Sequence, residues 1–154
     1  MMDGQENRRL ALLQDVAADS LVIHEIYGSI QGESSYAGLP CTFVRTSACH
    51  LRCSYCDTPH AFHQGESMAM AEIERAVADL GHPLVEITGG EPLLQANVLV
   101  LMRRLCDLGY KVLLETSGSL DISAVDARVI RIVDMKTPFS GEVGANLYEN
   151  LDVL

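Results

Sequence analysis

The sequence predicts an α/β fold built on a parallel β-sheet, and two observations support this prediction. Short apolar stretches rich in β-forming residues alternate with segments whose apolar residues recur at helical spacing, which is typical of βαβ units with right-handed crossovers. In addition, a polar, glycine-rich or cysteine-rich motif follows each of four predicted strands. Because the carboxyl ends of parallel strands lie on one face of a sheet, we expect these four loops to meet there.

Composition and charge exclude several classes of protein. The chain of 154 residues fits one domain, and its 48% hydrophobic content is sufficient for a core. Its formal net charge of -10 argues against nucleic acid as a partner, since phosphate binding depends on an excess of Lys and Arg. The polar residues 1–9 precede no apolar leader segment, and no apolar run is long enough to span a membrane. We therefore expect a cytoplasmic protein that binds neither nucleic acid nor membrane.

Four segments precede the cysteine-rich stretch. The first resembles a helix, because Leu10, Leu13 and Val16 recur at a spacing of three, and we assign residues 1–20 to an N-terminal extension. Two β-rich segments follow, separated by a loop that contains several Gly and Ser residues. The expected bounds are a helix at 1–18, strands at 21–27 and 41–46, and a loop at 28–38.

Helices and strands alternate after the cysteines. Ser67 is a suitable N-cap for a helix that ends at Gly81, and Pro92 suits the first turn of a second helix that ends before Gly109. A weaker helical pattern and a last strand follow, and the remainder from residue 137 is loop-like with a short helix near residue 147. The expected bounds are helices at 67–80, 92–108 and 122–127, and strands at 84–88, 110–114 and 129–133.

The stretch that carries most of the chemical information is Cys49-His50-Leu51-Arg52-Cys53-Ser54-Tyr55-Cys56, a C-x3-C-x2-C motif. Three thiolates this close together can hold a soft metal centre, but a closed zinc or iron-sulfur site generally has four ligands. Three interpretations remain open from spacing alone. They are a zinc site completed by His50, His60 or His63, a set of buried thiols without a ligand, and a 4Fe-4S cluster with one iron open to a substrate or cofactor.

A second motif, Gly89-Gly90-Glu91-Pro92, follows the predicted strand at 84–88. Two glycines let the backbone approach a ligand closely, and the Glu91 carboxylate could accept a hydrogen bond from an ammonium group. Taken alone, this motif is most simply an ordinary turn between a strand and a helix. On the same face of the sheet as the cysteines, it favours a ligand-binding site.

Together, the C-x3-C-x2-C motif and the Gly-Gly-Glu-Pro motif one strand later resemble the radical S-adenosylmethionine (SAM) superfamily. Within it, the chain resembles the 7-carboxy-7-deazaguanine synthase family of the queuosine pathway over about residues 21–154. The motifs that carry the narrower resemblance are Ile30-Gln31-Gly32-Glu33-Ser34, Phe43-Val44-Arg45, Cys56-Asp57-Thr58, Thr88 before the glycines, and Asp134-Met135-Lys136-Thr137-Pro138.

The resemblance implies a partial (β/α) barrel of the radical SAM type that is truncated after its fourth core strand. The family core has six strands, whereas the pattern predicts four of them and an N-terminal strand. We therefore expect residues 21–154 to form an incomplete radical SAM core domain. A sheet without its last units would expose an apolar edge, so we expect the chain to be less stable than a full family member or to need a partner.

The implied activity is that of a radical SAM carbon-nitrogen lyase, which converts 6-carboxy-5,6,7,8-tetrahydropterin to 7-carboxy-7-deazaguanine with loss of ammonia. The implied cofactors are a 4Fe-4S cluster, recycled SAM and Mg²⁺, and no side chain is assigned as a catalytic acid or base. The implied partners are the pterin, an electron donor such as flavodoxin or ferredoxin, and a second copy in a homodimer. The alternatives are a radical SAM activase that generates a glycyl radical on a partner protein, and a zinc-bound structural module without enzyme activity.

The resemblance also implies three sets of site residues. By charge, Asp57 is a better Mg²⁺ ligand than Thr58, so the chemistry of the residues and the family pattern differ at this point. Arg45 suits the carboxylate of the pterin because a guanidinium can bind it through two hydrogen bonds. The implied metal ligands are Cys49, Cys53 and Cys56 for the cluster and Thr58 for Mg²⁺; the SAM contacts are Tyr55, Cys56, Asp57, Gly90, Asp134, Met135 and Lys136; the pterin contacts are Ile30, Gln31, Gly32, Arg45 and Thr88.

Overall fold

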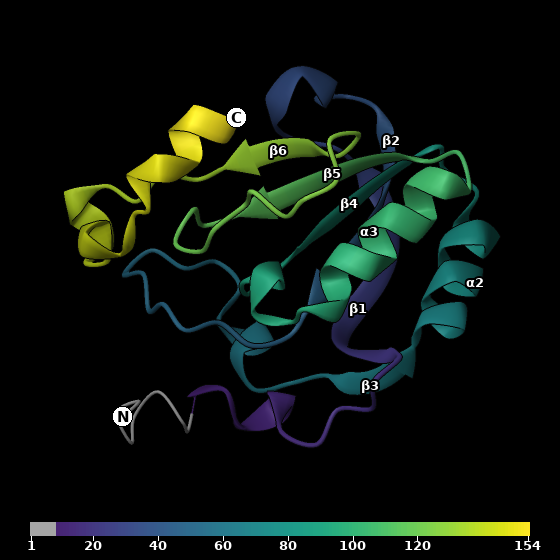
Figure 1. Ribbon diagram of the computed structural model, residues 1–154, viewed down its shortest axis with the longest axis horizontal. Helices are drawn as coiled ribbons and strands as arrows, with labels where there is room; N and C mark the ends of the chain where they lie inside the picture. Colours follow the sequence, from purple (N-terminus) through teal and green to yellow (C-terminus); the bar gives the residue numbers. More distant parts are fainter. Residues whose placement is uncertain (1–8) are drawn as a thin grey trace.

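The computed structural model describes residues 9–154, and they form one six-stranded mixed sheet (Figure 1). The strand order is β3-β1-β2-β4-β5-β6, in which β2, β4, β5 and β6 are parallel and β1 is antiparallel to both of its neighbours. The parallel arrangement predicted for the four core strands is confirmed. The strands are β1 Ser20–Ile30, β2 Pro40–Thr46, β3 Glu66–Ala69, β4 Leu84–Gly89, β5 Lys111–Thr116 and β6 Ile130–Val133.

Two α-helices, α2 (Met70–Leu80) and α3 (Asn97–Asp107), cover one face of the sheet (Figure 1). Their apolar stripes pack on the strand side chains that point to this face, among them Val85 and Ile87 of β4. Because side chains alternate along a strand, Glu86 between them points to the other face. That face has a smaller apolar cluster and, as described below, the candidate site.

Short 3₁₀-helices occupy several of the connections. One lies between β1 and β2, one follows the cysteine motif, and three follow β6, where the sequence pattern predicts a loop-like remainder and a short helix near residue 147. Their bounds are Ala11–Leu13, Ser34–Tyr36, Pro59–Phe62, Pro92–Leu94, Pro138–Ser140, Val143–Ala145 and Tyr148–Val153.

The starts of both α-helices differ from the prediction. Ser67 lies in β3 and is not an N-cap; the helix begins at Met70, where the Glu72 carboxylate accepts a hydrogen bond from the Ala69 N–H at 2.9 Å. Pro92 begins a 3₁₀-helix, and α3 begins five residues later at Asn97. Ser67 pairs with β1 as part of β3, and the 3₁₀-helix Pro92–Leu94 occupies the predicted first turn of α3.

Three further segments also differ from the prediction made from the sequence. β1 continues through Gly28–Ile30, which the Gly and Ser content assigned to a loop, because these residues pair with β2. The segment predicted as a helix at 122–127 forms turns, with Ile122 and Val125 buried in the core. Of the helix predicted at 1–18, residues 1–8 lie outside the described part, and residues 10–18 contain a 3₁₀-helix at Ala11–Leu13. Among residues 9–154, no helix combines the length and the apolar character needed to cross a membrane.

Candidate active site

The loops that follow the four parallel strands meet around one cavity of about 440 Å³, as the alternating pattern predicted. The cavity opens on the sheet face that the helices leave uncovered, and strand side chains such as Phe43 and Glu86 form its floor. The predicted site residues that line it are Gln31, Gly32, Arg45, Cys49, Cys53, Tyr55, Cys56, Asp57, Thr58, Thr88, Gly90, Asp134 and Lys136.

Two residues of the predicted set do not line the cavity. Ile30 lies at the end of β1 with 57% of its surface exposed. Met135 is partly buried, with its sulfur near Gly118. Their assignment to the pterin and to SAM therefore stays a prediction that the cavity does not support.

The glycine motif is joined to the cysteine loop by backbone hydrogen bonds. The Gly90 N–H donates to the Thr46 carbonyl at 3.1 Å, and the Glu91 N–H donates to the Ala48 carbonyl at 2.9 Å. A Cβ atom on Gly90 would lie 2.1 Å from the Ala48 oxygen and 2.9 Å from Cys49 Cβ, so only glycine fits here. The pairing of β2 with β4 thus continues past both strands and fixes the start of the cysteine loop.

The three cysteines of the motif present an incomplete set of soft ligands to this cavity. Cys49 is buried with 7% of its surface exposed, whereas Cys53 and Cys56 are half-buried. Burial raises the pKa of the Cys49 thiol to about 11 and also raises the pKa of Cys53. A bound metal centre would displace these protons, because metal ligation favours the thiolate. The donor set fits a cluster with one open position.

The histidines considered for a zinc site do not complete this set. His50, His60 and His63 are all absent from the cavity lining. His50 Nε2 is 2.9 Å from the Ser119 hydroxyl, and the His60 ring lies 4.9 Å between centroids from the His24 ring of β1, tilted by 46°. The geometry therefore favours an open iron-sulfur site over a closed zinc site.

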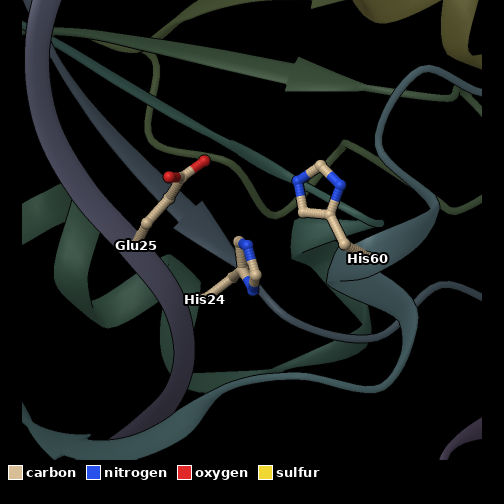
Figure 2. A group of neighbouring side chains, drawn as sticks. All are labelled: His24, Glu25 and His60. Carbon is tan, nitrogen blue, oxygen red and sulfur yellow. The ribbon is translucent and has the colours of Figure 1, made fainter.

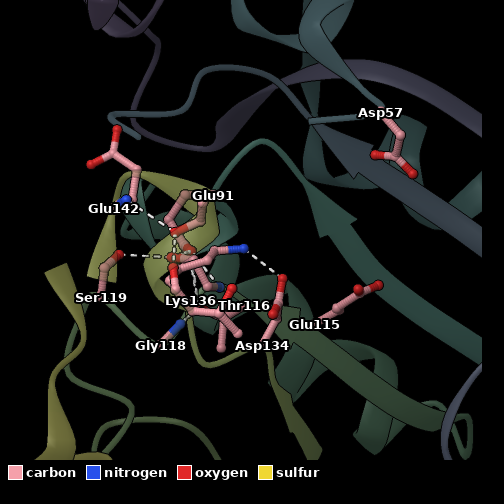
Figure 3. A network of polar contacts seen from close by, with 12 residues as sticks. Asp57, Glu91, Glu115, Thr116, Gly118, Ser119, Asp134, Lys136 and Glu142 are labelled. Atoms are coloured by element: carbon pink, nitrogen blue, oxygen red, sulfur yellow. Dashed lines mark hydrogen bonds and ion pairs between the residues drawn. The ribbon is translucent and has the colours of Figure 1, made fainter. Parts of the chain in front are cut away.

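Glu91 has a different role from the one that the sequence suggested. Its side chain is fully buried and does not line the cavity. The carboxylate accepts hydrogen bonds from the Thr116 hydroxyl (Figure 3). It also accepts from the Ser117 hydroxyl and from the backbone N–H groups of Ser117 and Leu93. Glu91 thus links the loop after β4 to the loop after β5 by hydrogen bonds. These donors satisfy the Glu91 carboxylate without an ammonium ligand.

An acidic group on the cavity floor was missed by sequence reasoning. Glu86 contacts the Gln31 amide and Glu115, and burial raises the pKa of Glu86 to about 8, helped by the hydrogen bond and charge of Glu115. The charge of Glu115 also raises the pKa of Glu33. The one available signal was a charged residue inside the apolar stretch Leu84-Val85-Glu86-Ile87, which the period-two pattern would place opposite the helices.

Arg45 and Lys136 supply positive charge to the same cavity. The Arg45 side chain is 16% exposed, and it donates to Glu25 at 2.8 Å and to the Tyr27 hydroxyl at 3.1 Å. Lys136 forms an ion pair with Asp134, also visible in Figure 3. Elsewhere in the cavity lining, the Thr58 hydroxyl donates to the Asp57 carboxylate at 2.6 Å. Two ion pairs, Arg45 with Glu25 and Lys136 with Asp134, thus lie at a polar pocket large enough for small molecules.

Residues 43–136 match the family described as the radical SAM superfamily. The chain belongs to this superfamily, and membership implies a 4Fe-4S cluster and SAM as cofactors. Among individual relatives, it is 54% identical over 134 residues to the 7-carboxy-7-deazaguanine synthase of Koribacter versatilis, covering 86% of this chain and 59% of that one. It is 49% identical over 130 residues to the enzyme of the same name from Chlorobaculum tepidum, covering 84% of this chain and 59% of that one.

The fold has a solved counterpart. The crystal structure of QueE from Escherichia coli superimposes with a TM-score of 0.67 at 24% sequence identity, covering 74% of this chain and 60% of that one. The α/β fold of radical SAM type and the resemblance to 7-carboxy-7-deazaguanine synthases are confirmed. The chain spans about 59% of the length of the two curated relatives named above.

Proposed function

We propose that this chain carries the cofactor and substrate site of a 7-carboxy-7-deazaguanine synthase, which converts 6-carboxy-5,6,7,8-tetrahydropterin to 7-carboxy-7-deazaguanine with loss of ammonia. The observation that carries the proposal is one cavity that joins the three thiols of the cysteine motif to Gln31, Arg45 and Thr88. The identity of 54% to a relative of that name supports the same substrate.

Cys49, Cys53 and Cys56 would hold the 4Fe-4S cluster, which together with SAM would supply hydrogen-atom abstraction from C6 of the pterin. The backbone from Tyr55 to Asp57 and the bare backbone of Gly90 line the side of the cavity next to these cysteines, where SAM would lie. Asp134 and Lys136 approach from β6, and their mutual ion pair fixes both side chains.

The pterin would bind over the floor of the cavity. The Arg45 guanidinium is held in orientation by Glu25 and Tyr27 and can still present charge to the carboxylate of the substrate. Gln31 and Thr88, with hydrogen bonds to Glu86 and Glu115, would supply directional contacts to the polar edge of the ring. A carboxylic acid that keeps its proton, as the raised pKa of Glu86 favours, can donate a hydrogen bond where a carboxylate cannot.

Mg²⁺ would bind at Thr58. The Thr58 hydroxyl donates a hydrogen bond to the Asp57 carboxylate, so the lone pairs of the Thr58 oxygen can bind a hard cation. In this arrangement Asp57 orients the Thr58 hydroxyl and adds negative charge near the Mg²⁺ position. A flavodoxin or ferredoxin as electron donor, a homodimeric assembly and a cytoplasmic location belong to the same proposal, and a reducing compartment suits the free thiols.

Anaerobic turnover tests the proposal. The reconstituted chain is incubated with SAM, Mg²⁺, a reductant and the carboxypterin, and the product is measured by chromatography and mass. We expect a brown protein with about four irons per chain, and formation of the deazaguanine without any protein substrate. The Cys53→Ala variant should lose both the colour and the product. A colourless protein that holds one zinc, or a requirement for a partner protein as hydrogen donor, would contradict the proposal.

A further inference from the structure

We propose that His24, Glu25 and His60 form a second metal site, which takes a divalent transition metal such as Zn²⁺ and is separate from the cavity (Figure 2). One ligand atom from each side chain lies within 4.8 Å of the other two. None of the three residues lines the cavity. Two imidazoles and one carboxylate are a ligand set that zinc uses, with water in the remaining position.

A β-bulge brings consecutive residues of β1 to the same point. The pairing of β1 with β2 shifts register between Ile23 and Glu25, so His24 is the extra residue. In a regular strand, neighbouring side chains point to opposite faces, and a bulge re-aims one of them. The imidazole of His24 and the carboxylate of Glu25 can therefore both approach His60 (Figure 2).

His60 comes from a segment that is itself fixed. It lies in the 3₁₀-helix Pro59–Phe62, which is anchored to the cysteine loop by the hydrogen bond from the Ala48 N–H to the Ala61 carbonyl at 2.9 Å. The His24 and His60 rings lie 4.9 Å apart between centroids, at a tilt of 46°. The site thus draws on two elements that the fold already holds in contact.

The hydrogen-bond partners of His24 and Glu25 are also compatible with metal binding. His24 Nδ1 lies 3.2 Å from the Gln64 carbonyl, which can only accept, so Nδ1 carries the proton and Nε2 keeps its lone pair. Glu25 accepts from Arg45 Nε at 2.8 Å through Oε1, and a carboxylate has a second oxygen for a metal. Metal-ligating histidines and carboxylates generally have such hydrogen-bond partners, which orient them.

To bind an ion, the ligand atoms, which lie within 4.8 Å of one another, must move closer together. Zinc-ligand bonds of about 2.0–2.1 Å place tetrahedral ligand atoms about 3.3 Å apart. Glu25 and His60 are exposed and His24 is half-buried, so the ion can enter from solvent and the side chains can rotate inward. A bound ion would then cross-link β1 to the segment that begins immediately after Thr58.

Zinc binding to the cluster-loaded chain tests this proposal. Anaerobically reconstituted protein, in which the cluster occupies the cysteines, is dialysed against Zn²⁺ in the presence of excess Mg²⁺. We expect one zinc per chain in addition to the cluster iron. X-ray absorption at the zinc edge should show nitrogen and oxygen neighbours at about 2.0–2.1 Å, and no sulfur at about 2.3 Å.

Single variants locate the zinc. His60→Gln and Glu25→Gln should each weaken zinc binding by about tenfold or more, by analogy with the loss on perturbing a metal site. His63→Gln is the matched control, because His63 is an exposed histidine three residues away and outside the cluster of ligands. The iron content of all three variants should equal that of the parent chain. Sulfur neighbours around the zinc, or equal zinc affinity in His60→Gln and His63→Gln, would overturn the proposal.

Discussion

The Glu91 carboxylate accepts two hydrogen bonds from Ser117, one from the backbone N–H at 2.9 Å and one from the hydroxyl at 2.6 Å. This contact joins the loops after β4 and β5 beneath the cavity, away from solvent. A charged group in this position is stable because every hydrogen bond it accepts comes from a fixed donor of the fold.

Replacement of Glu91 by Gln should therefore destabilise the chain. The amide keeps the shape of the side chain but places an NH₂ group against donors, which leaves buried groups unsatisfied. We expect the free energy of unfolding to fall by about 2 kcal/mol in urea titrations. Glu149→Gln, at an exposed position, should change it by less than about 0.5 kcal/mol. Equal unfolding curves for the two variants would contradict the structural role given to Glu91.

Gly90→Ala should disturb the cysteine loop. The new methyl group would overlap the Ala48 carbonyl and Cys49 Cβ, so the loop must shift. We expect a loss of stability of about 1–3 kcal/mol and a lower iron content after reconstitution. Gly144→Ala is the control, because a Cβ at Gly144 meets no atom within 4 Å. Full iron loading of Gly90→Ala with unchanged stability would count against this packing.

Arg45→Lys should weaken substrate binding. A lysine ammonium group cannot donate hydrogen bonds to Glu25 and Tyr27 and also form two parallel hydrogen bonds to a carboxylate. If Arg45 binds the pterin carboxylate, KM should rise by about tenfold or more, with a smaller change in kcat. Arg103→Lys, at an exposed position of α3, should behave as the parent chain. An unchanged KM for Arg45→Lys would show that Arg45 does not bind the pterin carboxylate.

The Glu86 carboxyl should make stability depend on pH. Its pKa is about 8 in the folded chain, against 4.5 for an ordinary Glu. Between these pH values the folded chain holds a proton that the unfolded chain has lost, so this group lowers the free energy of unfolding as pH rises. The slope is at most about 1.4 kcal/mol per pH unit.

Urea unfolding at pH 5.5 and pH 7.5 measures the effect in the chain without ligands. The decrease in stability between the two pH values should be smaller in Glu86→Gln, which cannot titrate, than in the parent chain. Glu149→Gln should retain the full decrease. The same decrease in all three proteins would show that Glu86 ionises normally.

Thr58→Val tests the assignment of Mg²⁺. Valine keeps the shape of threonine and removes the hydroxyl, so the Mg²⁺ concentration for half-maximal turnover should rise by about tenfold or more. Thr137→Val, at an exposed position beside the cavity residue Lys136, is the control. An unchanged Mg²⁺ requirement in Thr58→Val, with a strong change in Asp57→Asn, would favour direct ligation by Asp57.

The sequence was informative where a local pattern determines the structure. The spacing of Cys49, Cys53 and Cys56 and the glycine pair after β4 predicted the centre of the cavity, because motifs after parallel strands must meet at one edge. Apolar residues at helical spacing predicted both α2 and α3, and short apolar stretches predicted the four core strands.

The sequence was uninformative where long-range pairing decides. The bulge at His24 depends on how β1 aligns with β2, which no pattern within β1 reveals, so the approach of His24 to His60 could not be predicted. Glu86 is similar, because its pKa depends on burial in the folded chain and on Glu115, twenty-nine residues away on the neighbouring strand. The turn at 122–127 has apolar residues at helical spacing because they fill the core, and the spacing arises without a helix.

The backbone bonds from Gly90 and Glu91 to Thr46 and Ala48 extend a parallel ladder beyond the ends of β2 and β4. Gly90, Glu91 and the start of the cysteine loop are consequently joined in one hydrogen-bonded unit. With a cluster on Cys49 and SAM beside Gly90, as proposed above, this unit would hold the two groups at a fixed separation.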